Sequence, residues 1–441
     1  MTEMAAGRPN ILVVVTDDQR DGVTEIVMPK TVKWLREGGR EYKNAITVTP
    51  ICGPARASIM TGLHVHNHTV WTNNRGRNLP QTKTMQRHLH EIGYRTLLVG
   101  KFINAWKTAN GVLLKPDPLH WDQFRFASNA NCMFPNINCR HRGWKRYNVN
   151  GRVRTIETYP TRYIAQAFSK FVDAGPEPWF AYLCPPNPHS PYGIQKAHKH
   201  AHVGGFAGNP ATAENTPSEK ADKPAYIRDA TFGLARGKEK RRRQLRSLMS
   251  VDDMIDALFR KLQSRGQLDN TLVFLLSDNG MLWSEHTWGK KRVPYEQSIR
   301  IPFFVRGPGF AGGTTDSRLV ANIDVAPTVY QAAGITDPPV CDGRPLQTDF
   351  DRGHILIQYF KDASFVVPKW ATVLTKTAKY TEYYRNGTGT QGDTVLSTEF
   401  YNLDTDPWEL KNKRNPPDGR PFKAQLNIDR KSPPPVPDGA V

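Results

Sequence analysis

The sequence predicts an α/β protein: a mostly parallel sheet with helices on both faces, joined to a smaller C-terminal domain. Two apolar runs rich in β-branched residues, at 10–18 (NILVVVTDD) and 270–280 (NTLVFLLSDNG), are typical of strands buried on both faces. Helix-like patterns lie between such runs, at 28–39 and 250–266. Buried strands that alternate with helices favour a parallel sheet between two helical layers.

Two more buried strands are expected, within 91–101 (EIGYRTLLVGK) and 178–189 (PWFAYLCPPNPH). Cys184 lies inside the second of these runs and is interpreted as a buried apolar side chain. Each strand is followed by polar residues and loop signals. In open parallel sheets, ligands bind beyond the carboxyl ends of the strands. Residues at the four strand ends can therefore meet although they are distant in sequence.

The C-terminal part of the chain has a different pattern. Short segments such as HILIQYF and EFYNLDTDPWELKN suggest antiparallel strands and a terminal helix. We therefore expect a main domain over 1–345 and a small α+β domain with a Pro-rich tail over 346–441. Residues 187–240 are rich in Pro, Gly, His and Lys, which predicts a long surface excursion near the strand ends.

The formal net charge of +19 at pH 7 predicts a surface that attracts anionic ligands. The densest basic run, KEKRRRQLR at 238–246, is interpreted as a solvated helix face, with contact to a polyanion as the alternative. The sequence has neither zinc-finger spacing nor an aromatic RNA-binding pattern. A nucleic acid is therefore not expected as a partner.

No run approaches the roughly 18 apolar residues of a membrane span, so none is expected. Residues 1–10 also have no apolar core of a signal peptide. We expect a cytoplasmic location by default, or secretion if the given N-terminus is trimmed. Five cysteines are too few for a disulfide scaffold, but Cys132 and Cys139 could form a loop disulfide in an oxidising compartment.

Paired polar residues follow two of the expected strands. Asp17 and Asp18 follow the first strand, and Asp278 and Asn279 follow the later one. Three carboxylates and an amide at one edge of the sheet predict an oxygen-only site for a hard cation, Ca²⁺ or Mg²⁺. Either pair alone could instead cap a helix or form an Asx turn. Two matching pairs favour the cation, because carboxylates brought together without one would repel each other.

The stretch TVTPICGPARASIMTG at 47–62 places Cys52 between two prolines and before a helix-like run. A thiolate is a soft ligand and is poorly matched beside a hard, oxygen-bound cation. Arg56, in the first turn of the expected helix, favours binding of a tetrahedral anion at the helix N-terminus. From these residues alone, Cys52 could be an activated thiol nucleophile or simply a buried thiol.

PICGPARASIMTG resembles the signature of the type I sulfatases, in which the cysteine is oxidised to formylglycine after synthesis. GYRTLLVGK resembles the family's second signature and SDNG its late metal pair; KRVPYEQSIRIPF and YNLDTDPWELKN resemble two later segments. The resemblance implies an alkaline-phosphatase-like fold and hydrolysis of a sulfate monoester. It also implies a maturation partner, the formylglycine-generating enzyme.

The resemblance assigns the cation ligands. They would be Asp17, Asp18, Asp278, Asn279 and the modified Cys52. A hydrated aldehyde offers oxygens that a hard cation accepts, and one of them can attack sulfur. The expected cofactors are therefore Ca²⁺, with Mg²⁺ as the alternative, and formylglycine derived from Cys52.

The resemblance also assigns the remaining catalytic residues. Arg56 and Lys101 would fix and neutralise the hydrate and the sulfate. His189 and Lys291 would contact the ester, and one or both would protonate the leaving alcohol. Because Lys290 adjoins Lys291, it could take that lysine's place.

One segment departs from the common family pattern. GKFINAW has Ile103 and Asn104 where many members carry an aromatic residue and a histidine that helps to deprotonate the hydrate, so the base is not identified. The segment resembles the form found in N-acetylglucosamine-6-sulfatases and heparan endosulfatases. Asn104 is accordingly expected to contact substrate or sulfate. His286 is left outside the catalytic set, with a contact at the rim of the site as its expected place.

The favoured substrate is a sulfated carbohydrate, with an aryl sulfate as an alternative, because of the net charge and the GKFIN segment. Two other functions stay open. One is hydrolysis of a phosphonate or phosphate monoester by an enzyme of the same superfamily. The other is binding of polyanions by a protein without catalytic activity.

Overall fold

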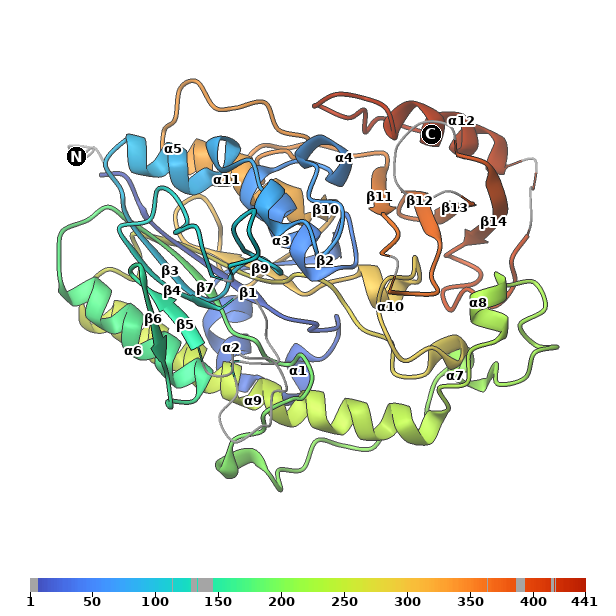
Figure 1. The fold of residues 1–441 in the computed structure, drawn as a ribbon, viewed down its shortest axis with the longest axis horizontal. Helices are drawn as coiled ribbons and strands as arrows, with labels where there is room; N and C mark the ends of the chain where they lie inside the picture. The colour runs from blue at the N-terminus through green and yellow to red at the C-terminus, as the bar shows by residue number, and fades with distance from the viewer. Residues whose placement is uncertain are drawn as a thin grey trace.

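The computed structural model describes residues 7–112, 114–127, 133, 146–362, 364–385, 393–413, 416 and 418–441. A ten-stranded sheet lies between two layers of helices, and a separate four-stranded sheet lies at one end of the molecule (Figure 1). This architecture is the α/β fold that the sequence predicts.

The large sheet is mostly parallel, as expected. The five central strands, from β8 to β4 in spatial order, run parallel to one another. By contrast, β9 runs antiparallel to both of its neighbours, and β5 and β6 form an antiparallel ribbon at one edge. In spatial order the strands are β10 (Thr314–Ala321), β2 (Arg40–Ile46), β9 (Phe303–Arg306), β8 (Thr271–Ser277), β1 (Asn10–Thr16), β7 (Trp179–Cys184), β3 (Arg95–Lys101), β4 (Gln123–Ala127), β5 (Arg146–Val149) and β6 (Arg152–Thr155).

Strand β1 is apolar throughout because helices cover both faces of the sheet. Ile11, Val13 and Val15 belong to the hydrophobic cluster on one face, and Leu12 and Val14 to the cluster on the other. The first cluster includes residues of α3 (Cys52–Thr61), α5 (Met85–Glu91) and α11 (Val325–Ala332). The second includes residues of α6 (Pro160–Asp173) and α9 (Leu234–Ser264).

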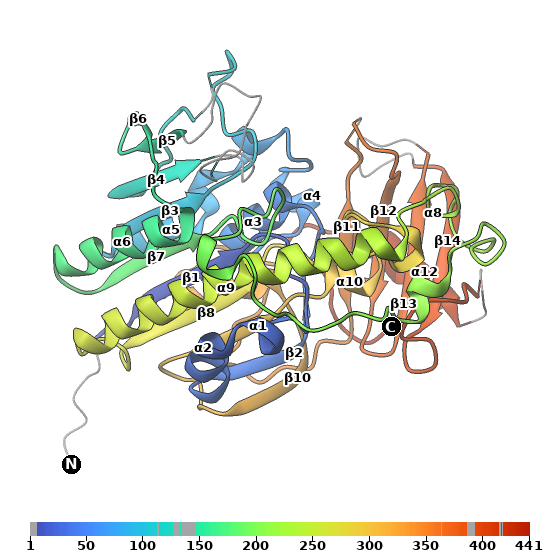
Figure 2. The ribbon, with the colours of Figure 1, turned by 90° about the horizontal axis from the view of Figure 1, so that it is seen from below.

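Helix α9 is longer than the sequence patterns indicate. It begins at Leu234, so the predicted excursion at 187–240 ends earlier than expected, and the basic run at 238–246 lies inside the helix. In Figure 2, α9 crosses the molecule in front of the central strands. The segment at 28–39 forms α2 (Pro29–Thr31) and a π-helical turn, Val32–Glu37. The other helices are short: α1 (Thr24–Val27), α4 (Val65–His68), α7 (Pro210–Ala213), α8 (Ala225–Arg228) and α10 (Glu296–Ile299).

The second sheet is antiparallel, with β11 (Ile355–Tyr359), β12 (Lys369–Leu374), β13 (Ala378–Tyr384) and β14 (Val395–Asn402) in sequence order. The terminal helix α12 (Gly419–Asp429) packs on this sheet through Phe422 and Leu426.

The two sheets share a hydrophobic core. Ile46, Val48 and Ile51 of the main part of the chain belong to the same buried cluster as Ile357 and Trp370 of the second sheet. This cluster contains residues from both sides of residue 345, so it does not separate two domains there. The predicted domain boundary at residue 345 stays a prediction.

Cys184 is fully buried in β7, as expected. Cys132 and Cys139 lie outside the described residues. No helix in the described part of the chain has both the length and the apolar character needed to cross a membrane.

Candidate active site

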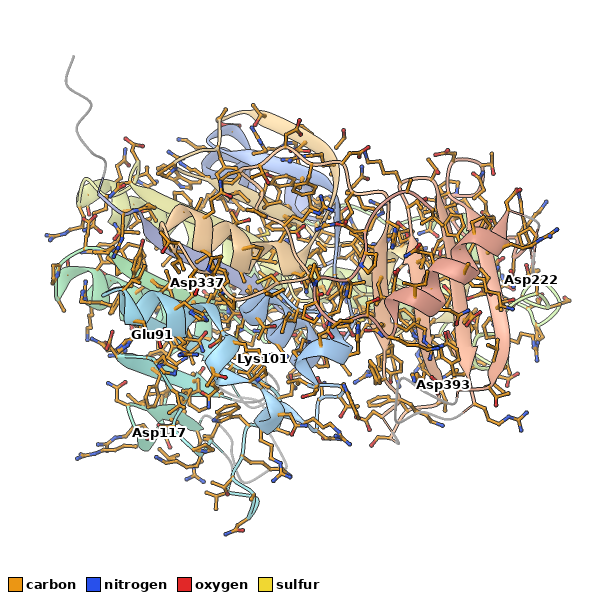
Figure 3. All side chains as sticks on the ribbon, turned by 90° about the horizontal axis from the view of Figure 1, so that it is seen from above. Glu91, Lys101, Asp117, Asp222, Asp337 and Asp393 are labelled. Atoms are coloured by element: carbon orange, nitrogen blue, oxygen red, sulfur yellow. The ribbon has the colours of Figure 1, made fainter. Side chains whose placement is uncertain are left out.

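Four neighbouring parallel strands deliver polar residues to one edge of the large sheet. Thr16 of β1 pairs with Ser277 of β8, so Asp17 and Asp278 leave the sheet side by side. On the other side of β1, β7 leads into the loop that carries His189, and the next strand, β3, ends at Lys101. Figure 3 shows Lys101 in the middle of the molecule. The strand ends therefore place distant parts of the sequence around one point.

Helix α3 brings Cys52 to this point. The helix begins at Cys52, and the preceding Ile51 offers no side-chain cap. Instead, the Gly53 N–H donates a hydrogen bond of 2.8 Å to Asn73 Oδ1, which satisfies one free donor of the first turn. Asn73 was not among the predicted site residues, because it lies in a loop without a recognisable motif.

Arg56 lies one turn after Cys52 and is completely buried. Its Nε and one terminal guanidinium nitrogen each lie 2.9 Å from Asp278 Oδ2. Its other terminal nitrogen donates a hydrogen bond of 3.0 Å to the Lys101 carbonyl oxygen. Arg56 thus joins α3 to the ends of β8 and β3. Burial and the nearby Asp17 charge nevertheless raise the pKa of Asp278, although Arg56 opposes them.

Asp17 lies between Lys101 and Cys52. Its Oδ2 accepts a hydrogen bond of 2.6 Å from Lys101 Nζ, and its Oδ1 lies 3.4 Å from Cys52 Sγ. Burial alone would raise the pKa of Asp17, but the charges of Lys101, His189 and Arg56 hold it well below its usual range. Conversely, burial lowers the pKa of Lys101, and Asp17 raises it above its usual value. The pair is therefore ionised at neutral pH.

Asp18 has a left-handed backbone, with φ of 68°, which is costly for a residue other than glycine. Its N–H donates a hydrogen bond of 3.1 Å to Asp278 Oδ1, which helps to hold this conformation. Its side chain pairs with Lys291 and accepts a hydrogen bond of 2.7 Å from Asn279 Nδ2. Burial would raise the pKa of Asp18, but Lys291 and His189 lower it below the usual value.

Of the adjacent lysines Lys290 and Lys291, Lys291 lies in the site. Its Nζ is 2.6 Å from Cys52 Sγ and 3.1 Å from Asn279 Oδ1, besides its contact with Asp18. The neighbouring Lys290 is exposed and makes none of these contacts. Of the two lysines considered from the sequence, the structure thus brings only Lys291 to Cys52.

The donor set fits a hard divalent cation. Single ligand atoms of Asp17, Asp18, Cys52 and His189 all lie within 4.8 Å of one another. The Lys291 ammonium already lies against oxygens of Asp18 and Asn279, so these oxygens stabilise positive charge. Carboxylate and amide oxygens are the ligands that Ca²⁺ and Mg²⁺ prefer. The Cys52 sulfur is the soft exception among them.

The Cys52 side chain is not an activated thiol. Burial raises its pKa to about 12, although Lys101 and Lys291 favour the thiolate. At neutral pH the unmodified side chain is therefore a neutral thiol. This argues against the thiol nucleophile that the local sequence left open.

His189 lies at the mouth of the site, with 19% of its side chain exposed. Its Nδ1 lies 2.5 Å from the Ser190 carbonyl oxygen, so Nδ1–H is the donor, and its Nε2 lies 3.8 Å from Asp18 Oδ2. Nε2 is therefore the ring nitrogen that faces the site.

Asn104 lies beside the start of α3. A Cβ added to Gly53 would be 3.6 Å from Asn104 Cβ. The Asn104 Oδ1 is buried and accepts no hydrogen bond from any described residue. The side chain thus lies against the first turn of α3, with a buried acceptor that no described residue satisfies.

His286 does not lie at the rim of the site, contrary to expectation. It is fully buried, its Nδ1 is 2.5 Å from Glu214 Oε2, and its ring centroid is 4.3 Å from that of Tyr295. Glu214 comes from the excursion before α9, so sequence proximity to the lysine segment could not indicate this contact.

Comparison with known proteins supports the resemblance. The family model described as Sulfatase matches residues 9–335, and the model described as N-sulphoglucosamine sulphohydrolase, C-terminal, matches residues 284–431. The extracellular sulfatase SULF-1 homolog of Drosophila melanogaster is 30% identical over 360 residues, which cover 77% of this chain and 31% of that protein. The N-acetylglucosamine-6-sulfatase of Homo sapiens is 30% identical over 358 residues, covering 75% and 62%.

These curated relatives are longer than this chain, which spans about a third to three fifths of their length. An arylsulfatase of Clostridium perfringens is 23% identical over 96% of this chain and 93% of its own. The comparisons give no support to the expected cytoplasmic location, since one relative is named an extracellular sulfatase.

Solved structures share the fold over almost the whole chain. A structure described as a complex with its substrate D-glucosamine-2-N,6-O-disulfate has a TM-score of 0.75 at 20% identity, covering 95% of this chain and 96% of that one. The phosphonate monoester hydrolase of Agrobacterium radiobacter has a TM-score of 0.70 at 18% identity, covering 95% and 94%. These likenesses concern the fold. The match of the sulfatase model to residues 9–335 shows the family: this chain belongs to the sulfatases.

Proposed function

We propose that this chain hydrolyses a sulfate monoester after oxidation of Cys52 to formylglycine by a formylglycine-generating enzyme. The observation that carries the proposal is the environment of Cys52. Its side chain lies between the Asp17–Lys101 and Asp18–Lys291 pairs, yet its own thiol has a pKa of about 12. Such a site has the charges of a catalytic centre but lacks a reactive thiol, which a formylglycine hydrate would replace with an oxygen nucleophile.

The charge balance of the site suits an anionic ester. Three carboxylates, of Asp17, Asp18 and Asp278, face three cationic side chains. The balance is then close to neutral, and a divalent cation makes it positive. Ca²⁺, with Mg²⁺ as the alternative, would be held by Asp17, Asp18, Asp278, Asn279 and the modified Cys52. The cation would supply Lewis-acid polarisation of a sulfate oxygen.

The protein's own side chains then have separate tasks. Lys101 and Arg56 hold the carboxylates of Asp17 and Asp278 and present positive charge toward the sulfate. His189 directs Nε2 into the site; when both ring nitrogens are protonated, the Nε2 proton can pass to the leaving alcohol oxygen. Lys291 lies 2.6 Å from Cys52 Sγ and can donate to the same oxygen or hold the sulfate.

The proposed substrate class is a sulfated carbohydrate. The relatives named N-acetylglucosamine-6-sulfatase, the structural neighbour that binds a sulfated glucosamine, and the net charge of +19 all support it. Asn104 beside Cys52 would accept a hydrogen bond from a sugar hydroxyl. The extracellular relative favours secretion over the cytoplasmic default.

The test combines mass spectrometry with two chromogenic substrates. The mass of the tryptic peptide Asn44 to Arg56, from protein made in its native host, is expected to show an aldehyde in place of the thiol. The same preparation should turn over nitrophenyl sulfate, and Cys52→Ala should not. An intact thiol in fully active protein would refute the formylglycine mechanism.

The runner-up is hydrolysis of a phosphonate or phosphate monoester. The shared fold of a phosphonate monoester hydrolase supports this alternative. Turnover of nitrophenyl phenylphosphonate at a higher kcat/KM than nitrophenyl sulfate would favour it over the sulfatase proposal. Polyanion binding without catalysis would instead leave both esters intact.

A further inference from the structure

A large basic groove opens beside the candidate active site. Its volume is about 1370 Å³, and its walls come from the loop after β7, the segment that leads into α6, and one face of α9. Six arginine and lysine side chains line it against two glutamates, Glu157 and Glu239. The six are Arg162, Lys196, Lys199, Arg242, Arg243 and Arg246. The basic run at 238–246 therefore contributes three of its arginines to one concave surface.

Hydrogen bonds tie the wall of this groove to the cation ligands. The N–H of Asp17 donates a bond of 3.1 Å to the Asn187 carbonyl oxygen. The Asn187 amide in turn donates bonds of 2.8 Å to the Tyr159 hydroxyl and to Ser247 Oγ. Tyr159 lines the groove, and Ser247 donates a bond of 2.5 Å to the carbonyl oxygen of Tyr192, which also lines it. The same framework thus positions the site and the groove.

Helix α9 passes from the site into the groove. Its Gln244 donates a hydrogen bond of 3.3 Å to the Asp18 carbonyl oxygen, and the flanking Arg243 and Arg246 line the groove. Tyr192 lies three residues after His189. Burial and the Asp18 charge raise the pKa of Tyr192, and the Arg243 charge opposes this rise. Tyr192 therefore lies where the mouth of the site meets the groove.

The groove arginines carry charge that the protein neutralises only in part. Arg242 and Arg243 share a single carboxylate, Glu239, and about half of each side chain is exposed. Arg246 donates to the neutral carbonyl oxygen of Ala201, at 3.0 Å. Concentrated like charge on a concave surface attracts polyanions. Because the groove is continuous with the active site, one polyanionic chain could occupy both.

We propose that this groove binds a linear sulfated polysaccharide, holding sulfate groups of the sugars next to the one whose ester lies at Cys52. The inference rests on the proposed function for its link to turnover, but the binding itself can be measured without catalysis. A sulfated chain is favoured over nucleic acid because the groove adjoins a site built for sulfate.

The test measures binding of heparin to the full-length Cys52→Ala protein at several salt concentrations. Arg243→Ser with Arg246→Ser removes two groove charges. The matched control, Arg260→Ser with Arg265→Ser, removes one charge from the last turns of the same helix and one from its C-cap, outside the groove. We expect the groove variant to raise the Kd for heparin by about tenfold, and to reduce the slope of log K against log salt by roughly one to two. The control should change neither.

A second measurement links the groove to turnover. With Cys52 intact, the groove variant should raise KM for a sulfated oligosaccharide severalfold, and Arg243→Lys with Arg246→Lys should restore it. Equal heparin affinity of the groove variant and the parent would overturn the inference, as would equal weakening by the control. So would DNA of matched length binding as tightly as heparin. Failure to hydrolyse nitrophenyl sulfate would instead count against the proposed function and leave the heparin result to be read on its own.

Discussion

Two clusters of buried charged side chains in this protein differ in composition and in surroundings. The site cluster comprises the carboxylates and cations around Cys52: Asp17, Asp18, Asp278, Arg56, Lys101 and Lys291. The anchor cluster lies where the lysine segment meets the second sheet. It comprises Glu296, Lys379, Glu399 and Glu409 with the phenols of Tyr295, Tyr383 and Tyr401.

Protein donors satisfy the carboxylates of the anchor cluster. Glu399 accepts hydrogen bonds from three tyrosine hydroxyls: Tyr295 at 3.0 Å, Tyr383 at 2.5 Å and Tyr401 at 2.7 Å. Lys379 pairs with Glu409 and, at 3.2 Å, with Glu296. In the site cluster, by contrast, the Asp17–Lys101 pair and Lys291 surround the side chain of Cys52. His189, at the mouth of the site, is partly exposed.

The difference shows how the second sheet supports the site. Tyr295 and Glu296 follow Lys291 by only four and five residues, and they bond to strands β13 and β14. Lys291 therefore reaches Cys52 from a segment that the second sheet holds in place. The site cluster is open to a ligand at its mouth, and the anchor cluster holds in place the segment that carries Lys291.

The sharpest separation of the two clusters is expected from Cys52→Ala. This change should lower kcat for nitrophenyl sulfate by about 10³-fold or more, because the precursor of the nucleophile is gone. The free energy of unfolding should change by less than about 1 kcal/mol, since a small buried side chain is shortened by one atom. Turnover assays and urea unfolding of the same preparation check both statements. Retained turnover would show that the site cluster does not act through this residue.

Lys379→Met in the anchor cluster is expected to lower the stability of the protein more than its turnover, which is the reverse of the effect of Cys52→Ala. The change leaves Glu296 and Glu409 buried with less positive charge, which should cost about 3–5 kcal/mol of unfolding free energy. Urea unfolding measures the loss. Glu382→Gln, at a β13 carboxylate that accepts from Tyr380 and Tyr384 instead, is a control with an expected smaller loss. Equal losses in the two variants would mean that the anchor cluster has no special structural role.

A divalent cation should distinguish the clusters next. At about 100 times its Kd, Ca²⁺ should add roughly 3 kcal/mol to the free energy of unfolding, and excess chelator should remove that increment. Asp17→Asn with Asp18→Asn should abolish the increment, because two of the proposed ligands lose their charge. Glu399→Gln should keep it, since that carboxylate belongs to the anchor cluster. Thermal unfolding with and without Ca²⁺ gives the comparison, and an increment that survives loss of Asp17 and Asp18 would place the cation elsewhere.

The site cluster could be predicted from sequence because its geometry follows from local patterns. Strands buried on both faces imply a parallel sheet, and parallel strands bring their carboxyl ends to one edge, so Asp17 and Asp278 had to lie close. The identities of the other residues came from the family resemblance. Its segments are short, but they place Lys101 at a strand end and His189 and Lys291 in loops, and the structure brings these residues together.

The anchor cluster could not be predicted in this way. Lys379 lies in β13 and Glu296 in α10, 83 residues apart, so no local pattern links them. Asn73 beside Gly53 and Glu214 beside His286 were missed for the same reason, because each contact depends on how a loop folds back. The early start of α9 was missed because the residues before the basic run have no clear apolar period.

The smallest expected effect is a pH dependence outside both clusters. His354 precedes β11, and its imidazole nitrogens lie 2.8 Å from Asp429 Oδ2 and 2.7 Å from the Gly439 carbonyl oxygen. Burial lowers the pKa of His354, but Asp429 more than compensates, so its pKa is above the ordinary value of 6.5. A raised folded pKa gives stability that is fully present below pH 6.5 and is lost as pH rises through the folded pKa. The unfolding free energy of the parent should therefore exceed that of His354→Gln by about 1–2 kcal/mol at acidic pH, and the difference should shrink at alkaline pH.

The lowered pKa values of Asp17 and Asp18 act in the opposite direction. Their contribution is lost only as pH falls below about 4, so the difference in unfolding free energy between the parent and His354→Gln, from about pH 5.5 to pH 9, reports on His354. A difference that stays constant over this range would mean that His354 does not gain its proton on folding.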